Sequence, residues 1–265
     1  MQNFTLACFG PVFFALHLAT SPTARPSPTA EARRAGVLPA APALRLLPLA
    51  VLLGYIVPSV VLALPAPGLV SYAAQQAAIA VWTPFPVWVG LAQLVLTWCV
   101  ASLAPSGSRP AREADAQHED GVRAARAVYV FALVGSAAVH VGVVAVSAST
   151  VLFPAIFSPP YVAEFAPANL LFPKNVVVPS IGAGVLNFMQ WDQWIGYTAV
   201  LLWALALRHA DEAVSLRTWT QGALRAVLAS VVVGPGGAAA WLIWMRDEKA
   251  FASAPAAGRK QSSSS

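Results

Sequence analysis

The sequence is poor in charged residues. Asp, Glu, Lys and Arg together make up 10% of the 265 residues, whereas a soluble globular domain typically contains about 25%. Hydrophobic residues account for 58% of the chain, and many of them stand in uninterrupted runs long enough for a helix to cross a bilayer. The low charge and the long apolar runs exclude an ordinary soluble domain. In lipid, only helices and closed barrels satisfy the backbone hydrogen bonds. The composition predicts an all-α, polytopic integral membrane protein.

The sequence also lacks the residue patterns of several functional classes. Its two cysteines, Cys8 and Cys99, both stand in apolar runs, which gives no basis for a disulfide framework or a metal cluster. No Cys/His pair has zinc-binding spacing, and there is no Gly-rich phosphate loop. The net charge of +5 comes mainly from basic residues in loops and in the tail, where membrane topology places them. We therefore expect no metal, no cofactor and no nucleic-acid partner.

The apolar runs define the expected membrane spans. They lie at residues 3–20, 44–64, 86–104, 127–146 and 223–245, with two half-spans at 176–190 and 193–207. Counting the halves separately gives seven spans, and fusing them gives six. The basic loop 21–43 is expected in the cytosol, and the basic tail favours seven spans because the C-terminus then returns there. Residues 1–245 are expected to form one transmembrane domain, followed by a basic, Ser-rich, disordered tail at 246–265.

Residues 186–197 place a single carboxylate, Asp192, between the two half-spans. The amides Asn187 and Gln190 and the aromatic residues Trp191, Trp194 and Tyr197 surround it. A carboxylate at membrane depth costs about 2.5–3.5 kcal/mol, so it usually faces the bundle interior or a wet cavity. This favours a functional site. The alternative is that Asp192 caps a helix that begins at Gln193, and the two interpretations are compatible.

The spacing of these residues leads to a second expectation. On one continuous helix, Asn187, Gln190, Trp191 and Trp194 share a face, whereas Asp192 lies about 100° away. A break in the helix would remove that conflict and let Asp192 turn toward the same cavity. We therefore predict a broken helix near Asp192.

Further candidate residues lie elsewhere in the chain: His17, His140, Gln76, Trp82 and Glu164. Each histidine is either a hydrogen-bonded residue of its helix or a pocket residue. Gln76 and Trp82 are placed to line a cavity mouth, although a Trp there also suits an interfacial aromatic belt. Glu164 belongs to a long loop, 148–175, on the side opposite the cytosol. It is either a second acid that folds over a cavity or a solvated carboxylate, and residues 105–126 are expected to form a solvated charged loop.

Several short motifs together resemble a known family. They are Asn3-Phe4, Gly10-Pro11-Val12-Phe13-Phe14, His17 and Ser21-Pro22 in and after the first span; Gln75-Gln76, Trp82 and Phe85-Pro86; and Asn187-Phe188-Met189-Gln190-Trp191-Asp192. This set is similar to the small membrane-bound terpene cyclases of fungal meroterpenoid pathways, of the ascochlorin- and macrophorin-cluster type. The resemblance implies that an acid protonates a terminal epoxide or alkene of a prenyl chain, usually farnesyl, on an aromatic or polyketide head. The carbocation then closes rings in an apolar pocket.

The resemblance also implies the partners and the location. It implies a cyclase of the isomerase or lyase type that acts without a metal, in agreement with the missing Asp-rich magnesium motif. It implies a hydrophobic prenylated substrate, contact with membrane lipid and with other membrane enzymes of the pathway, and a place in the endoplasmic reticulum or another endomembrane. The rival interpretations are a non-catalytic membrane scaffold and a small-solute transporter, for which an internal repeat would be expected.

The implied roles fall on the residues singled out above. A general acid for this step must hold its proton near neutral pH, which an apolar environment favours. Asp192 meets this requirement better than the other acids, which lie in loops or the tail, and Glu164 is the second candidate. The remaining candidates are expected to bind substrate. The ring faces of four of them stabilise the cation: Trp191, Trp194, Tyr197 and Trp82. Asn187 and Gln190 orient the acid or accept the final proton through water, and Gln76, His17 and His140 are pocket residues.

Overall fold

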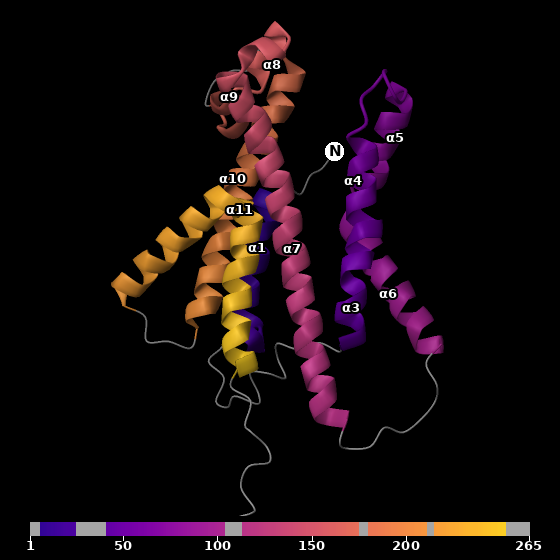
Figure 1. Cartoon of the computed structure of the whole chain (residues 1–265), viewed down its shortest axis with the longest axis vertical. Coiled ribbons are helices and arrows are strands. Elements are labelled where there is room, and N and C mark those ends of the chain that lie inside the picture. The colour runs from indigo at the N-terminus through magenta and orange to yellow at the C-terminus, as the bar shows by residue number, and fades with distance from the viewer. Residues whose placement is uncertain (1–5, 25–40, 104–112, 175–179, 211–214, 253–265) are drawn as a thin grey trace, which may run out of the picture. The chain divides into compact units, whose positions relative to one another are not determined.

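The computed structural model describes residues 6–24, 41–103, 113–174, 180–210 and 215–252, and every regular element in these ranges is a helix. The chain divides into two compact units, each of which we describe by itself (Figure 1). We call the first the 38–131 unit, because it consists mainly of Leu38–Phe131. The second, formed by Asn3–Val37 and Ala132–Ser265, is called the Asp192 unit.

The 38–131 unit is built around one long, locally widened helix. α3 (Ala41–Val51) passes through a π-helical turn, η2 (Leu52–Ile56), into α4 (Val57–Leu62). The widening suits Pro58, which has no N–H to bond the preceding turn. α5 (Tyr72–Trp82) and α6 (Phe85–Leu103) follow, and α6 packs so closely on η2 that a Cβ atom on Gly54 would lie 2.7 Å from Val89 Cα.

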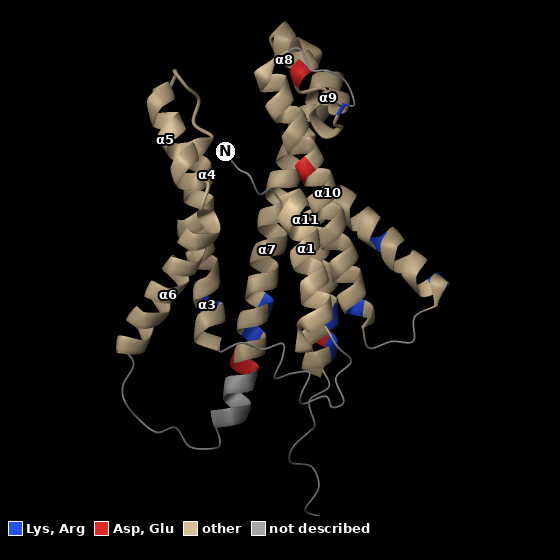
Figure 2. Ribbon diagram, turned by 180° about the vertical axis from the view of Figure 1, so that it is seen from behind, with Lys and Arg blue, Asp and Glu red and all other residues tan. Residues whose placement is uncertain are grey.

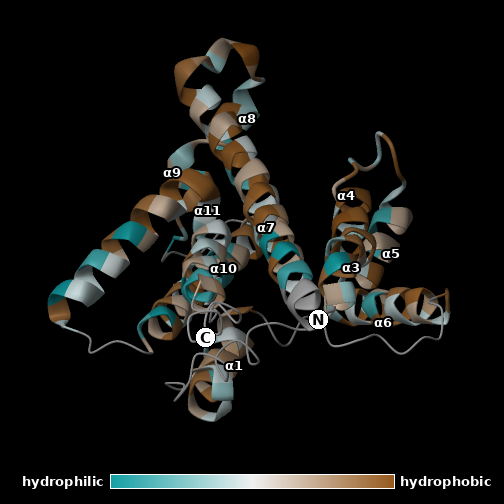
Figure 3. Ribbon diagram, turned by 60° about the horizontal axis from the view of Figure 1, so that its bottom comes forward, coloured by the Kyte–Doolittle hydropathy of each residue, from teal (hydrophilic) through white to brown (hydrophobic). Residues whose placement is uncertain are grey.

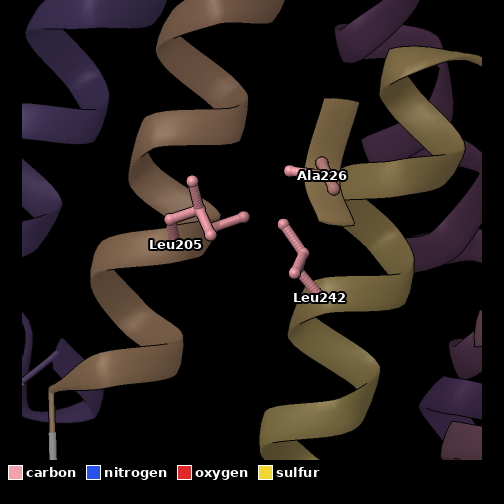
Figure 4. Close-up of a cluster of buried hydrophobic side chains, with 5 residues drawn as sticks. Leu205, Ala226 and Leu242 are labelled. Atoms are coloured by element: carbon pink, nitrogen blue, oxygen red, sulfur yellow. The ribbon is translucent and has the colours of Figure 1, made fainter. Parts of the chain in front are cut away.

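In the Asp192 unit, α1 (Leu6–Thr20) packs along α10 (Ile181–His209), which packs in turn on α11 (Leu216–Ala252) (Figure 1). Between α10 and α11 the buried cluster consists of Ala204, Leu205, Ala226, Ala239 and Leu242. Figure 4 shows Leu205 of α10 directed toward Ala226 and Leu242 of α11. Small side chains at such a contact let two helices approach closely, and in lipid this van der Waals packing drives their association.

α7 (Glu113–Leu152) contributes to both units. Residues 113–126, which we expected in a solvated loop, are helical, because α7 extends well beyond its apolar part. After α7, residues 153–174 form three short helices that we call the cap segment: η3 (Pro154–Ile156), α8 (Pro159–Glu164) and α9 (Pro167–Leu171). The buried Ser147 of α7 ties this segment down by donating a hydrogen bond to Phe165 O at 2.8 Å.

The helix break predicted near Asp192 is wrong. α10 is continuous from Ile181 to His209, and Ser180 caps it by accepting a hydrogen bond from Ala183 N–H at 3.2 Å. Asp192 therefore lies inside a helix and does not cap one that begins at Gln193. No proline interrupts α10, and the helix packs against α1 and α11.

The break lies in α11 instead, where Gly234 has φ 78° and ψ 159° and Pro235 follows (Figure 1). Pro235 has no N–H, so Val231 O loses the partner that it would have in a regular helix. His140 of α7 replaces that partner, with its Nε2 3.0 Å from Val231 O, and Ser136 donates to Val233 O at 3.2 Å. Two side chains one turn apart on α7 thus satisfy the carbonyl groups that the break frees.

Four helical stretches of the described residues have the length and apolar character to cross a membrane: Ala41–Leu62, Phe85–Leu103, Glu119–Leu152 and Leu216–Ala252. The ribbons are almost free of charged residues over long stretches (Figure 2), and hydrophobic residues predominate in α4 (Figure 3). α1 is apolar but shorter, with 15 residues. A helical membrane protein is therefore supported, but the count of seven spans is not confirmed. Residues 181–190 and 193–207 of the two expected half-spans belong to the single helix α10, and residues 176–179 lie outside the described residues.

The predicted tail also needs a correction. α11 continues to Ala252, so residues 246–252, which we expected to begin a disordered tail, are helical. Contacts hold this end in place: Arg246 donates to Thr23 O at 2.9 Å, and Asp247 and Phe251 are buried. The rest of the predicted tail, residues 253–265, lies outside the described residues.

Candidate functional site

The carboxyl group of Asp192 faces the first turn of α1. Its Oδ1 accepts a hydrogen bond from Ala7 N–H at 2.7 Å, in a partly buried position. Ala7 is the second described residue of α1, and its backbone N–H makes this bond to the side chain of another helix. The contact fixes the orientation of the Asp192 carboxyl group.

Gly196, one turn further along α10, makes this contact sterically feasible. Gly196 is buried, and a Cβ atom placed on it would clash with Leu6 Cγ and lie 2.7 Å from Leu6 Cδ2. A glycine at such a point lets two helix backbones approach closely. Asp192 and Gly196 thus receive the first turn of α1 side by side on one face of α10.

The other end of α1 is held by His17. Trp203 Nε1 donates to His17 Nδ1 at 3.2 Å, and Thr23 Oγ1 lies 3.5 Å from His17 Nε2. Since Nδ1 accepts a hydrogen bond, the network assigns the proton of a neutral ring to Nε2. The ring of Phe14 stacks on that of Trp203 with centroids 4.9 Å apart. His17 is thus hydrogen-bonded between two helices, and its predicted role in substrate binding remains a prediction.

A second face of α10 binds the cap segment. Gln190 is only 7% exposed, and its Nε2 donates to Asn169 O at 2.7 Å and to Leu170 O at 2.8 Å. These carbonyl groups lie in the last turn of the short helix α9, where no backbone N–H of the helix is available to bond them. Gln190 therefore completes the hydrogen bonding of α9.

Two more side chains extend this contact along α10. Trp194 Nε1 donates to Leu171 O at 2.8 Å, and its ring stacks on Phe172 with centroids 5.8 Å apart. Asn187 accepts from Lys174 N–H at 2.6 Å and donates to Lys174 O at 3.1 Å. The cap segment is thus fastened to α10 by Asn187, Gln190 and Trp194, which lie on one face as their spacing predicts.

The structure therefore separates residues that we expected around one point. The polar groups of Asn187, Gln190 and Trp194 are bonded to the cap segment, whereas that of Asp192 is bonded to α1. This division follows directly from the continuity of α10. The side chain of Trp191 on the same helix is 38% exposed, and Glu164 on α8 is exposed.

Tyr197 and His140 lie at the break in α11. A Cβ atom placed on Gly236 would be 3.6 Å from Tyr197 Cε1 and 3.4 Å from Ser136 Oγ, so the helix start after the break packs against both. His140 packs on Gly234, because a Cβ atom placed on this glycine would lie 3.0 Å from the Cβ atom of His140. His140 thus supports the break through its hydrogen bond and its packing.

Trp82 and Gln76 belong to the 38–131 unit. Trp82 Nε1 donates to Ser59 Oγ at 2.9 Å, and its ring lies 5.5 Å from that of Phe85 and 6.5 Å from that of Tyr55. Gln76 is exposed on α5. Among the described residues, no three His, Cys, Asp or Glu side chains gather in a way that could hold a metal ion.

Comparison with known proteins supplies the family. A family model described as the CtvD domain matches residues 1–251. The chain belongs to the CtvD family. Its curated relatives include terpene cyclase ascI of Acremonium egyptiacum, 29% identical over 248 residues (92% of this chain and 59% of that protein). Terpene cyclase ctvD of Aspergillus terreus is 30% identical over 245 residues (92% of this chain and 64% of that protein).

Another relative, terpene cyclase sdgD of Emericella nidulans, is 31% identical over 193 residues, which cover 70% of this chain and 46% of that protein. This CtvD-family chain thus spans about half to two thirds of the length of these relatives. The resemblance to fungal meroterpenoid terpene cyclases is confirmed by these matches. No solved structure matches the chain.

Sequence reasoning missed two parts of the site in this CtvD-family chain, namely the Ala7 N–H group and Gly196. A backbone donor leaves no mark in a sequence. Gly196 could have been recognised from the sequence, because it stands one turn after Asp192 and therefore on the same face of any continuous helix. The expected break in α10 concealed that relation.

Proposed function

We propose that this chain is a terpene cyclase that closes rings in a prenylated, farnesyl-bearing substrate with an aromatic or polyketide head. The support comes from relatives that are named terpene cyclases and from one structural observation. Asp192, a carboxylate within an apolar helix, is held in a fixed orientation by Ala7 N–H. An oriented acid in an apolar bundle is what protonation of an unactivated epoxide or alkene requires.

The proposed reaction is an isomerisation in which Asp192 is the general acid. Its proton passes to the oxygen of a terminal epoxide, whose C–O bond breaks, or to a carbon of a terminal alkene. The π electrons of the next double bond then attack the cationic carbon, and rings close in turn. Loss of a proton from the last cation gives an alkene, so the product has the mass of the substrate and the proton balance is restored.

Other residues take the roles that the sequence predicts. The rings of Trp191, Trp194 and Tyr197 are proposed to stabilise the cation. The predicted roles of Asn187 and Gln190, orienting the acid or accepting the final proton through water, remain expectations, because both side chains bond the cap segment. Glu164 is proposed as a second acid. The predicted substrate-binding roles of His17, His140, Gln76 and Trp82 remain expectations.

The proposed setting is an endomembrane, such as the endoplasmic reticulum, where a prenylated substrate dissolves in lipid. The long apolar helices support a multi-pass membrane location. Other membrane enzymes of the same pathway are the proposed protein partners, since they would deliver the prenylated precursor within the same bilayer.

The test uses microsomes from a host without this activity, given a farnesylated phenol or its terminal epoxide. We expect the wild-type chain to form a cyclic isomer of unchanged mass, identified by mass spectrometry and NMR. Asp192→Asn keeps an oxygen that can accept from Ala7 N–H but has no acidic proton, so product should fall below detection. Glu119→Gln, which alters an exposed acid of α7, serves as the control and should leave product formation unchanged.

The outcomes separate the proposals. Full product formation by Asp192→Asn would show that another group is the acid, and Glu164→Gln, assayed in parallel, tests the second candidate directly. If the well-inserted wild-type chain isomerises neither compound, the proposed function is wrong for this substrate class.

A further inference from the structure

We propose that the first turn of α1 positions the reacting carboxyl group: Ala7 N–H holds Oδ1 of Asp192, Oδ2 is the oxygen that exchanges the proton, and Gly196 permits the approach. This inference rests on the proposed function, since it assigns a division of labour within the acid that the function requires. Ala7 and Gly196 are positioning residues, because they act on the substrate only through Asp192.

The hydrogen bond itself distinguishes the two oxygens. Oδ1 accepts from Ala7 N–H at 2.7 Å, at the short end of the usual range for such bonds. A carboxylic acid has one O–H group, and the oxygen that points at an N–H donor must offer a lone pair. The transferable proton of Asp192 therefore belongs on Oδ2.

The same contact stabilises the charge that the reaction creates. As the proton leaves Oδ2, negative charge develops on the carboxyl group. A hydrogen bond from a backbone N–H to a carboxyl oxygen becomes stronger as that oxygen gains charge. Because Ala7 N–H is already in place, it needs no reorganisation at the moment of transfer. Removal of one preorganised donor of this kind typically lowers kcat by about 10²–10³-fold.

The position of α1 is fixed at both ends. At the first turn, Leu6 lies against Gly196, where a Cβ atom would be 2.7 Å from Leu6 Cδ2. At the last turn, Trp203 donates to His17 at 3.2 Å. A side chain at position 196 would therefore push the first turn away while the other end stays anchored, and Ala7 N–H would leave Oδ1.

A competing explanation is that Asp192 is only a structural cap for α1. That role predicts a loss of folded protein when the bond is removed, with no selective effect on the chemical step. The positioning role predicts a lower kcat with little change in KM, because the interaction is made more strongly in the transition state than in the ground state. The kinetic constants of the inserted protein therefore distinguish the two.

The first experiment compares Ala7→Pro with Ala7→Gly in the microsomal cyclisation assay. Proline has no N–H, whereas glycine weakens the helix but keeps the donor. We expect Ala7→Pro to lower kcat by about 10²-fold at similar KM, and Ala7→Gly to stay close to wild type. Equal kcat values for the two variants at equal amounts of inserted protein would overturn the proposal.

The second experiment tests the steric part and does not depend on Ala7→Pro folding. Gly196→Ala places a methyl group against Leu6, and we expect a lower kcat. Leu6→Ala removes the atoms that the methyl group meets, so Gly196→Ala combined with Leu6→Ala should recover most of the lost activity. A double variant no better than Gly196→Ala, or a fully active Gly196→Ala, would contradict the positioning role.

These outcomes are distinct from failure of the proposed function. If the wild-type chain forms no cyclic product, the cyclase proposal fails and so does this inference. If the wild-type chain is active and the Ala7 and Gly196 variants match it, the cyclase proposal stands and the positioning role is wrong.

Discussion

At the scale of single residues, α10 uses polar side chains on two faces for two kinds of contact. Asp192 binds the first turn of α1, and Gln190 binds the end of α9. Both are side chains that bond backbone groups of another element. The residue types fit these tasks, because a carboxyl group accepts a single N–H and an amide nitrogen donates to two carbonyl groups.

Gln190→Leu should loosen the cap segment. The change removes both donors from Asn169 O and Leu170 O, and leaving buried acceptors unpaired costs about 1–3 kcal/mol. We expect lower thermal stability in detergent and faster proteolysis within residues 153–174. Gln193→Leu, at an exposed position three residues along the same helix, is the matched control and should change neither measurement. Identical cleavage rates for the two variants would show that Gln190 does not fasten the segment.

The sequence predicted the chemistry of this site better than its geometry. Asp192 stands out as the carboxylate within an apolar stretch, and the shared face of Asn187, Gln190 and Trp194 follows from helical spacing alone. Their partners do not follow from spacing. Ala7 N–H lies 185 residues from Asp192 in sequence, and a backbone donor carries no residue-type signal. Only the packing of α1 on α10 brings the two groups together.

At the scale of elements, the helix break was expected in α10 but occurs in α11. The boundaries of α6 were predicted within one residue, because an apolar run between prolines and small polar residues marks them. Polar residues inside α10 suggested a break there, yet tertiary partners satisfy them and the helix continues. In α11, Gly234 and Pro235 do interrupt the helix, because Ser136 and His140 of α7 are available to bond the freed carbonyl groups.

This account predicts coupling between His140 and Pro235. His140→Ala leaves Val231 O without its donor, which should cost about 0.6–2 kcal/mol for a hydrogen bond between membrane helices. In Pro235→Ala, residue 235 regains an N–H that can bond Val231 O within the helix, so His140→Ala should cost less there. The free energies of unfolding of the four proteins, measured by titration with a denaturing detergent in mixed micelles, give the coupling. Additive effects would mean that His140 does not replace the missing N–H.

At the scale of the whole molecule, the distribution of apolar helices determines which loops share a side of the membrane. Three candidate spans, Ala41–Leu62, Phe85–Leu103 and Glu119–Leu152, lie between the predicted loop that precedes α3 and the cap segment, so alternation places the two on opposite sides. The basic residues of the loop then indicate that the cap segment faces away from the cytosol. The side chains that fasten the segment to α10 would lie at that end of the bundle.

Engineered glycosylation sites test this arrangement in microsomes. Tyr161→Asn with Ala163→Thr creates an acceptor sequence at two exposed positions of α8, and Glu31→Asn with Arg33→Thr creates one in the loop 21–43. We expect a glycan on the first variant and none on the second, since glycosylation occurs on the side away from the cytosol. The reverse pattern would invert the orientation. Glycans on both would place the two segments on one side and show that the three helical stretches between them, Ala41–Leu62, Phe85–Leu103 and Glu119–Leu152, do not all span the membrane.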